Sequence, residues 1–186
     1  MKARALFHNP VVAALLVLFT LTGAVWAQTA DLDKLFDDLK SADAPSSERI
    51  EQEIWNEWSK SGSPAMDLLL QRGREAMGAG ETEIAIEHFT ALIDHAPDFA
   101  EGWNARATVL YQMGQFGPSM ADIAQTLKLN PRHFGAMSGF AMILEDLGRP
   151  EQALEVHQAV KAIHPNAAGV SEAIDRLTAD LQGSSL

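Results

Sequence analysis

The chain has 186 residues, of which 47% are hydrophobic, which excludes a disordered chain and suffices for one compact domain. Its net charge of −11 argues against nucleic acid or an anionic lipid surface as the partner. It has no cysteine, which excludes disulfides, thiolate metal sites, a cysteine nucleophile and a lipid anchor carried by a cysteine.

Residues 1–27 have the pattern of a signal peptide. Lys2 and Arg4 provide the positive start, an apolar stretch runs over residues 11–25, and Ala27 is the small residue after which we expect cleavage. An uncleaved anchor is the alternative, but a membrane span needs about 20 apolar residues and this stretch is shorter. The sequence therefore predicts an exported chain that begins at Gln28.

The next segment, residues 28–65, is predicted to form a pair of helices around a turn at residues 44–47. Apolar residues at helical spacing mark the first helix, Leu32, Leu35, Phe36 and Leu39, and the second, Ile50, Ile54, Trp55 and Trp58.

Internal repeats with a period of 34 residues follow, in the frames 66–99, 100–133 and 134–167. Five columns define them: Gly80, Gly114 and Gly148; Pro97, Pro131 and Pro165; Gly73, Ala107 and Ala141; Ala85, Ser119 and Ala153; and Phe89, Ile123 and His157.

Each column has a physical reason in a pair of antiparallel helices. A glycine suits the positive φ of the turn at which the first helix ends. Small residues fit where the two helices press closest, and Phe89 and Ile123 fill the space that this leaves. A proline ends the second helix because it lacks an N–H donor and crowds the preceding turn.

These columns resemble the tetratricopeptide repeat (TPR) family. The middle frame matches best, at Trp103, Ala107, Gly114, Phe116 and the run 129–131, whereas Leu69 and Met137 replace the family's tryptophan and His157 replaces an aromatic residue. The resemblance implies an all-α, right-handed superhelical stack of antiparallel helix pairs, a TPR solenoid. Extending the register back to 32–65 makes the N-terminal pair a degenerate repeat or cap, and residues 168–186 predict a C-terminal capping helix and tail.

Residues 101–108 and 131–135 also resemble small exported TPR proteins of Gram-negative bacteria. This resemblance implies a periplasmic or secreted protein that mediates protein–protein interaction. Its partner would be another protein or a peptide, of the cell envelope, and not a nucleic acid.

The TPR geometry places the first helix of each pair on the concave face, where an extended or helical peptide could bind. The alternative for each inward residue is packing against the neighbouring repeat. A grip on a C-terminal carboxylate is not expected, because Leu70, Ala105, Gly135 and Gly139 occupy most of the positions where the family places cations. The predicted peptide-binding residues are Leu70, Arg74, Met77, Asn104, Thr108, Tyr111, Ser138 and Met142.

The sequence predicts no enzyme, no cofactor and no metal site. It contains no Gly-x-Ser-x-Gly, no Gly-x-Gly-x-x-Gly and no phosphate-binding loop. The pairs His88 and His95, and His157 and His164, are each seven residues apart, too far along a helix to share one metal. His95 and His164 precede the prolines, where a cation would suit the helix dipole.

Two further expectations concern the partner. The middle repeat is close to neutral between acidic flanks, which favours a partner with basic flanks and an apolar middle. The alternative function is a permanent structural subunit or assembly factor of an envelope complex, which would bind through exposed faces of Trp55 and Trp58 or through the terminal helix.

Overall fold

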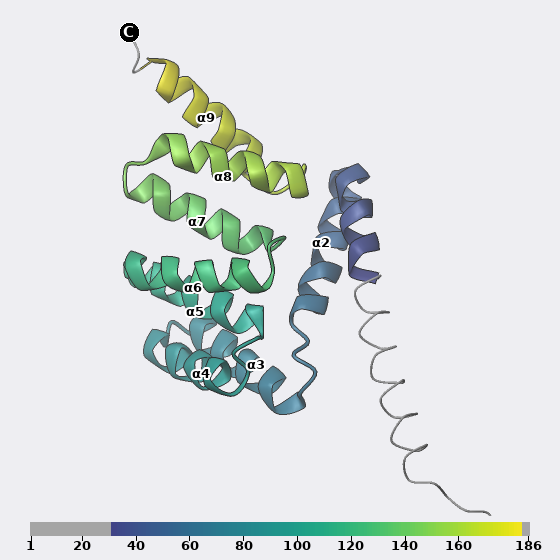
Figure 1. The fold of residues 1–186 in the computed structure, drawn as a ribbon, viewed down its shortest axis with the longest axis vertical. Helices are drawn as coiled ribbons and strands as arrows, with labels where there is room; N and C mark the ends of the chain where they lie inside the picture. The colour runs from purple at the N-terminus through teal and green to yellow at the C-terminus, as the bar shows by residue number, and fades with distance from the viewer. Residues whose placement is uncertain (1–30, 184–186) are drawn as a thin grey trace, which may run out of the picture.

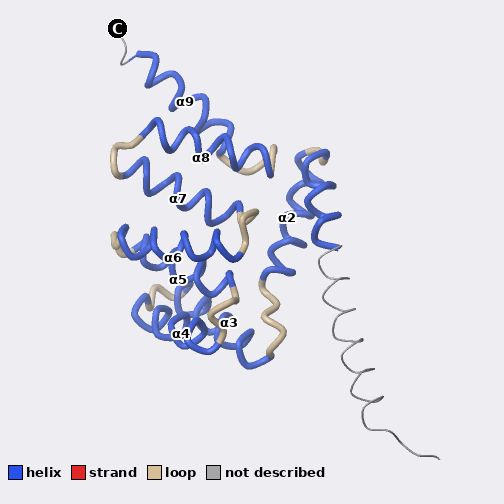
Figure 2. The backbone as a smooth tube through the Cα atoms, in the orientation of Figure 1, coloured by secondary structure: helices blue, strands red, loops and turns tan. Residues whose placement is uncertain are grey.

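A computed structural model describes residues 31–183, so the predicted signal peptide at 1–27 lies outside the described residues. Within 31–183 the chain forms helices joined by short loops, with no strand (Figure 2). Stacked helix pairs run from α3 to α8 and are followed by α9 (Figure 1), which confirms the predicted all-α solenoid. After a helix over residues 31–41, the order is α2 (Ala44–Trp58), α3 (Pro64–Gly78), α4 (Thr82–His95), α5 (Ala100–Gln112), α6 (Phe116–Leu129), α7 (Phe134–Asp146), α8 (Pro150–Ile163) and α9 (Val170–Gly183).

The predicted turn glycines end the first helix of each pair. Their φ values are 79° at Gly80, 70° at Gly114 and 66° at Gly148, in the left-handed region that favours glycine. After each glycine, the next N–H donates to the carbonyl five residues before it, at 2.9, 2.8 and 2.9 Å. These bonds satisfy carbonyls that the helix end would otherwise leave unpaired, so the turn is encoded locally.

The two small columns lie at the contact between paired helices, as predicted. A Cβ atom at Gly73 would lie 2.2 Å from Cε1 of Phe89, whose ring is fully buried. In the second pair the Oγ of Ser119 donates to the carbonyl of Ala107 at 2.8 Å, so this hydroxyl is buried with a partner. The buried members are Gly73, Ala107 and Ala141 from the first helices, and Ala85, Ser119 and Ala153 from the second.

The prolines end the second helices, and Trp103 joins one pair to the next. Helices α4, α6 and α8 end within two residues of Pro97, Pro131 and Pro165. The indole Nε1 of Trp103 donates to the carbonyl of Pro97 at 2.8 Å, which fixes the start of α5 against the end of α4.

A half-buried ion pair within the second repeat also contacts the first repeat. The guanidinium of Arg106 donates to both carboxylate oxygens of Asp122, at 2.7 and 2.9 Å, and to Thr90 Oγ1 of α4 at 3.2 Å. The hydrogen bond from Arg106 to Asp122 raises the pKa of the arginine. Two parallel bonds of this kind fix geometry as well as charge, so they set how α5 lies against α6, and the bond to Thr90 attaches both helices to α4.

The extended register predicts that the N-terminal helix pair stacks in front of the first repeat. The structure shows a different position. The pair lies beside the stack and packs against the ends of α7, α8 and α9 (Figure 1). Gly135 makes this possible, because a Cβ atom there would lie 2.5 Å from Cη2 of Trp55. The shared core contains Phe36, Leu39, Ile50, Ile54 and Trp58 of the pair with Phe134, Val160 and Val170 of the stack.

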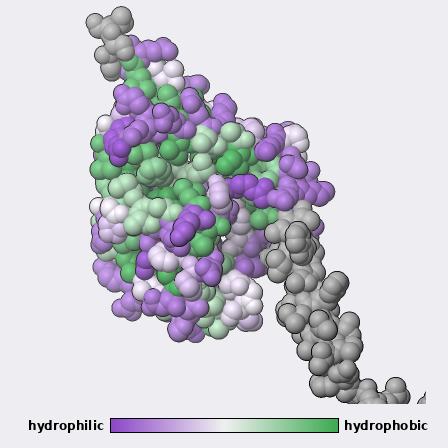
Figure 3. All heavy atoms as spheres, in the orientation of Figure 1, coloured by the Kyte–Doolittle hydropathy of each residue, from purple (hydrophilic) through white to green (hydrophobic). Residues whose placement is uncertain are grey.

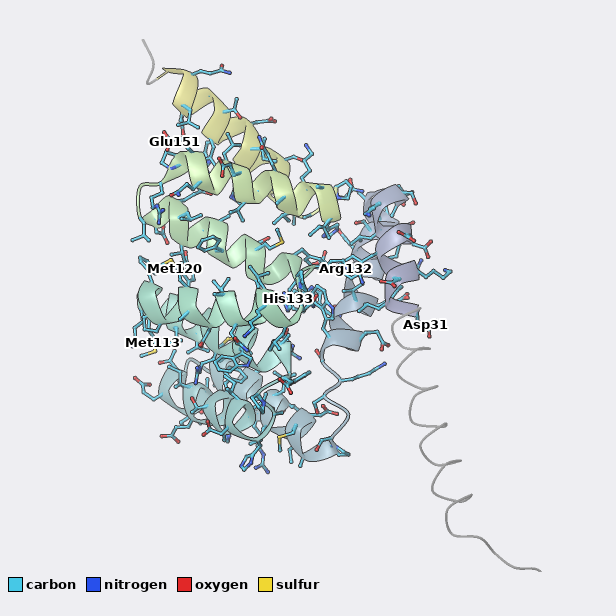
Figure 4. The ribbon with its side chains drawn as sticks, viewed as in Figure 1. Asp31, Met113, Met120, Arg132, His133 and Glu151 are labelled. Carbon is cyan, nitrogen blue, oxygen red and sulfur yellow. The ribbon has the colours of Figure 1, made fainter. Side chains whose placement is uncertain are left out.

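Polar contacts hold the same pair at its edges. Arg132, which precedes α7, donates to Asp33 at 2.5 Å, and its guanidinium lies 4.2 Å from the ring centre of Phe36. Asn166, after α8, donates to the carbonyl of Ala42 at 2.8 Å. Figure 4 shows Arg132 and His133 at the end of the stack that faces the helix pair. The N-terminal pair is therefore attached by contacts to the end of the stack and connected to the first repeat through residues 59–63.

The last helix, α9, covers the third pair, and Leu177 packs there on Leu144 and Ala153. A polar network joins the same three helices, since Glu145 accepts from Arg176 at 2.6 Å and bonds His157 Nε2 at 2.9 Å. Burial opposes the ionisation of Glu145, but the hydrogen bonds from His157 and Arg176 outweigh it and lower its pKa. No helix within residues 31–183 is long and apolar enough to cross a bilayer.

Candidate functional site

A groove of about 320 Å³ opens on the stack between α5, α6 and α7. The inner helices α5 and α7 form its walls, and Ser119 and Ile123 of the outer helix α6 form its floor. Five of the eight predicted peptide-binding residues line it: Asn104, Thr108, Tyr111, Ser138 and Met142. The predicted residues therefore lie in the walls of the groove. The floor residues Ser119 and Ile123 were not among them, because the repeat pattern places both in the packing between paired helices.

Small residues on facing surfaces create the groove. A Cβ atom at Gly139 would come no closer than 3.9 Å to Ile123 Cδ1, so the space over the floor is open. Ala107 and Ala136 leave room on either side, and Met142 at the edge is 47% exposed. Hydrophobic residues gather over α6, α7 and α8 in the view of Figure 3. The groove is therefore an apolar depression with hydroxyl and amide groups along its walls.

One rim of the groove carries an acidic group. The hydroxyl of Tyr111 donates to Oδ2 of Asp146 at 2.9 Å, and the tyrosine ring stacks on Phe116 with the ring centres 5.7 Å apart. The hydrogen bond to Asp146, together with burial, raises the pKa of Tyr111. Asp146 itself is exposed, so its carboxylate is accessible at the rim.

The other three predicted residues lie outside this groove. Leu70 is only 2% exposed and packs in the core of the first pair, and Met77 packs against the same core. The guanidinium of Arg74 donates to Glu101 Oε1 at 2.6 Å and to Ser59 Oγ at 3.0 Å. Arg74 is thus engaged with protein groups, and it does not supply a free cation to the concave face.

Glu101 is the centre of a buried polar network at the end of the groove nearest the N-terminal helix pair. Its carboxylate is 3% exposed and contacts Arg74, Asn104 and His133, the last at 3.0 Å. Asn104 belongs both to this network and to the groove wall. The sequence could have indicated the ion pair of this network, because Arg74 and Glu101 have opposite charges and lie on neighbouring inner helices.

His133 has a defined tautomer in this network. Its Nδ1 accepts the N–H of Ala136 at 3.1 Å and so caps α7, which leaves Nε2 as the atom that donates to Glu101. The ring stacks on Trp58 with the centres 4.2 Å apart and the planes at 20°. His133 therefore links the groove wall to the N-terminal helix pair.

The tryptophans of that pair are not exposed contact surfaces, and this part of the alternative prediction is wrong. Trp58 is 8% exposed, and Trp55 packs edge-on against it, with ring centres 5.2 Å apart. Both rings also contact Phe134 of α7. Their apolar surface is used within the chain, where it closes one end of the groove at Gly135.

His164 was expected to act as a cation at a helix end, and the structure shows a different role. Its ring is 1% exposed, packs on Phe134, and contacts Ser47 Oγ through Nε2 at 2.9 Å. Burial lowers its pKa below the ordinary value of 6.5, although Glu51 at 3.9 Å opposes the shift. The neutral ring joins the end of α8 to α2.

This shift predicts a loss of stability in mild acid. When folding lowers the pKa of a base, the unfolded chain binds the proton more tightly than the folded chain does. The free energy of unfolding is therefore highest above the unfolded pKa of 6.5 and declines as the pH falls below that value. His164→Gln can still bond Ser47 and cannot be protonated, so its urea midpoint should fall less than that of the parent between about pH 7.5 and 5.5. The exposed His95→Gln serves as the control and should behave as the parent does. Equal losses in all three proteins would show that His164 does not govern this window.

Among residues 31–183, no group of three or more His, Asp or Glu side chains is arranged to hold a metal ion.

Comparisons with known proteins match this architecture. The family model for the tetratricopeptide repeat matches residues 70–117 and 104–168. A TPR repeat-containing protein of Rhizobium etli is 36% identical over 154 residues, which cover 82% of this chain and 76% of that protein.

Among solved structures, the first TPR domain of Spaghetti (RPAP3), bound to an HSP90 peptide, has a TM-score of 0.60 at 20% identity over 63% of this chain and 93% of its own. The TPR2B domain of yeast Sti1, in complex with an Hsp70 peptide, has a TM-score of 0.58 at 20% identity over 63% and 99%. At these identities the two structures show a common fold. With the repeat columns, the family match and the Rhizobium relative, they establish that this chain belongs to the tetratricopeptide repeat family.

Proposed function

We propose that this chain is an exported, non-catalytic scaffold that binds another protein or a peptide in the groove between α5 and α7. The observation that carries the proposal is the groove itself, an apolar depression that the described residues leave open at the centre of the stack. Met142 offers a flexible apolar contact at its edge, and Thr108 and Ser138 offer hydrogen bonds. Such a surface holds a peptide side chain without supplying groups for a reaction.

The family supports the general part of this proposal. Tetratricopeptide domains are protein–protein interaction scaffolds, and two similar domains have been solved with chaperone peptides. The residues that line this groove include no Lys or Arg, and Arg74 is engaged by Glu101 and Ser59. We therefore infer the ligand of this chain from the residues of its own groove, and not from the peptides that those domains bind.

The location in the cell envelope rests on the sequence of residues 1–27. Lys2 and Arg4, the apolar stretch at 11–25 and the small Ala27 are the features of a cleaved signal peptide. The proposed partner is accordingly a protein of the periplasm or another part of the cell envelope.

One observation favours the alternative, a structural subunit that packs permanently in a larger assembly. Leu68 and Ile84 are 44% and 45% exposed on α3 and α4, at the end of the stack where no other helix within residues 31–183 packs on the first repeat. In the second repeat, the residue in the column of Leu68 is Gly102, which lies against Leu92 of the preceding pair. This front surface of the stack, defined by Leu68 and Ile84, could accept a helix of a neighbouring subunit.

A pair of matched variants separates the two functions. Met142 lies in the groove and Ile84 on the front surface, and their exposures are 47% and 45%. Met142→Lys should weaken capture of the partner from a cell-envelope extract at least about tenfold, because binding would bury an added ammonium group in the apolar groove. Ile84→Lys should leave capture unchanged. Both variants should keep the far-ultraviolet circular dichroism of the parent.

The reverse pattern would support the structural subunit, and retention of the partner by both variants would place the site elsewhere. Arg74→Glu is unsuitable as a groove variant. It would set a second carboxylate beside the buried Glu101 and destabilise the fold, whatever the groove binds.

A further inference from the structure

The groove accepts one kind of side chain at its centre. None of the residues that line it is charged, and its floor consists of Ile123 and Ser119, with Ala107 and Ala136 beside them. Ser119 is fully buried and donates its hydrogen to the carbonyl of Ala107, so it has no hydrogen to donate to a ligand. An ionised ligand group at the floor would lose its hydration without gaining a partner, whereas a Leu, Met or Phe side chain would bury apolar surface.

The two ends of the groove differ. At the end formed by the start of α7, Trp55 packs over Gly135, and the network of Arg74, Glu101 and His133 is complete in itself. No ligand charge is needed there, because the buried carboxylate already has a cationic partner. A ligand must therefore continue toward the opposite end, where α5 and α7 finish.

That opposite end carries an exposed carboxylate. Asp146, the last residue of α7, is exposed and bonded to the groove residue Tyr111 at 2.9 Å. A carboxylate at a helix C-terminus is disfavoured by the helix dipole, so this position is electrostatically costly unless a cation approaches it. The last turns of the outer helices contain basic residues, His95, Lys128 and Lys161, and those of α5 and α7 contain none. The nearby N-termini of α6 and α8 offset part of the dipoles, and Arg149 at the start of α8 adds an exposed positive charge. Asp146 is the carboxylate at this end that is bonded directly to a residue of the groove wall.

We infer that the groove takes an internal peptide segment in which a bulky apolar side chain lies next to a Lys or Arg, with the apolar group over Ile123 and the cation at Asp146. This inference rests on the proposed function and names its ligand class. The groove would make one apolar contact with the ligand, at Ile123, and one ion pair, at Asp146. Recognition of a free C-terminal carboxylate is not part of this binding mode. Binding should therefore weaken as the salt concentration rises.

The test is a titration of isotopically labelled protein with blocked heptapeptides, followed by NMR at Thr108, Ser138 and Met142. One peptide has a central Leu between two Lys residues. The second has Glu in place of Lys, the third has Ser in place of Leu, and the fourth is the Glu peptide with a free C-terminus. The first peptide should bind most tightly. Asp146→Asn, which can still accept from Tyr111, should weaken its binding about two- to fivefold, the factor for a partly exposed ion pair. Glu48→Gln on α2 removes an exposed charge from the N-terminal helix pair, at the other end of the groove from Asp146, and should change nothing.

The outcomes separate this inference from the proposed function. Equal or tighter binding of a Glu peptide at the same three residues would overturn the ligand class and leave the groove as a peptide site. An unchanged affinity in Asp146→Asn would overturn the role of that carboxylate. If no peptide shifts the groove resonances, both the inference and the proposed function fail.

Discussion

Gly73→Leu should lower the free energy of unfolding by at least about 1–3 kcal/mol, the typical cost of overpacking a close-packed interior. Even the first carbon of the new side chain would lie 2.2 Å from Cε1 of Phe89. The phenylalanine is fully buried between α3 and α4, so its ring has no free space into which it can turn. The measurement is urea unfolding followed by circular dichroism.

Gly78→Ala on the same helix is the matched control. A Cβ atom at Gly78 would meet nothing within 4 Å, and its backbone is helical, so alanine should be neutral or stabilise by up to about 1 kcal/mol. If both variants unfold at the midpoint of the parent, the 34-residue frame that aligns Gly73 with Ala107 and Ala141 is incorrect.

Trp58→Ala is expected to have the largest effect, a loss of about 3–5 kcal/mol. Trp58 is 8% exposed, stacks on His133 and contacts Phe36 and Phe134, so its removal opens a cavity between the N-terminal pair and α7. Repeat proteins normally hold together through neighbouring repeats alone. Here residues 31–58 also pack against the ends of α7, α8 and α9, and the loss should lower the stability of the whole chain.

Trp103→Ala supplies the comparison, because Trp103 is only half-buried and makes its hydrogen bond to Pro97 at the surface. Its urea midpoint should fall less than that of Trp58→Ala. A smaller loss for Trp58→Ala than for Trp103→Ala would mean that the N-terminal pair contributes little to the stability of the stack.

The repeat architecture could be predicted from the sequence because each of its rules is local. The positive φ of Gly80, the contact of Gly73 with Phe89 and the helix stop before Pro97 each involve residues of a single pair, and each recurs after 34 positions. Five wall residues of the groove followed from the same geometry. Local rules of this kind fix helix faces, and helix faces fix which residues point inward.

The position of the N-terminal pair could not be predicted in this way, because it depends on contacts that occur once. Trp55 fits over Gly135, and Arg132 meets both Asp33 and Phe36, with no counterpart in the other repeats. The same holds for Arg74, whose charge is used by Glu101 and Ser59 and not by a ligand. Periodicity identifies which face a residue occupies, and it does not identify the partner that a charged or aromatic side chain finds there.

The groove between α5 and α7 is the centre of this account, and the affinity of the captured envelope partner tests it most directly. Its dissociation constant should be measured for the parent, Met142→Lys and Ile84→Lys by calorimetry at low salt. We expect Met142→Lys to weaken binding at least about tenfold and Ile84→Lys to bind as the parent does. Unchanged binding by Met142→Lys, with the loss confined to Ile84→Lys, would show that the groove is not the binding site and identify the front surface of α3 and α4 instead.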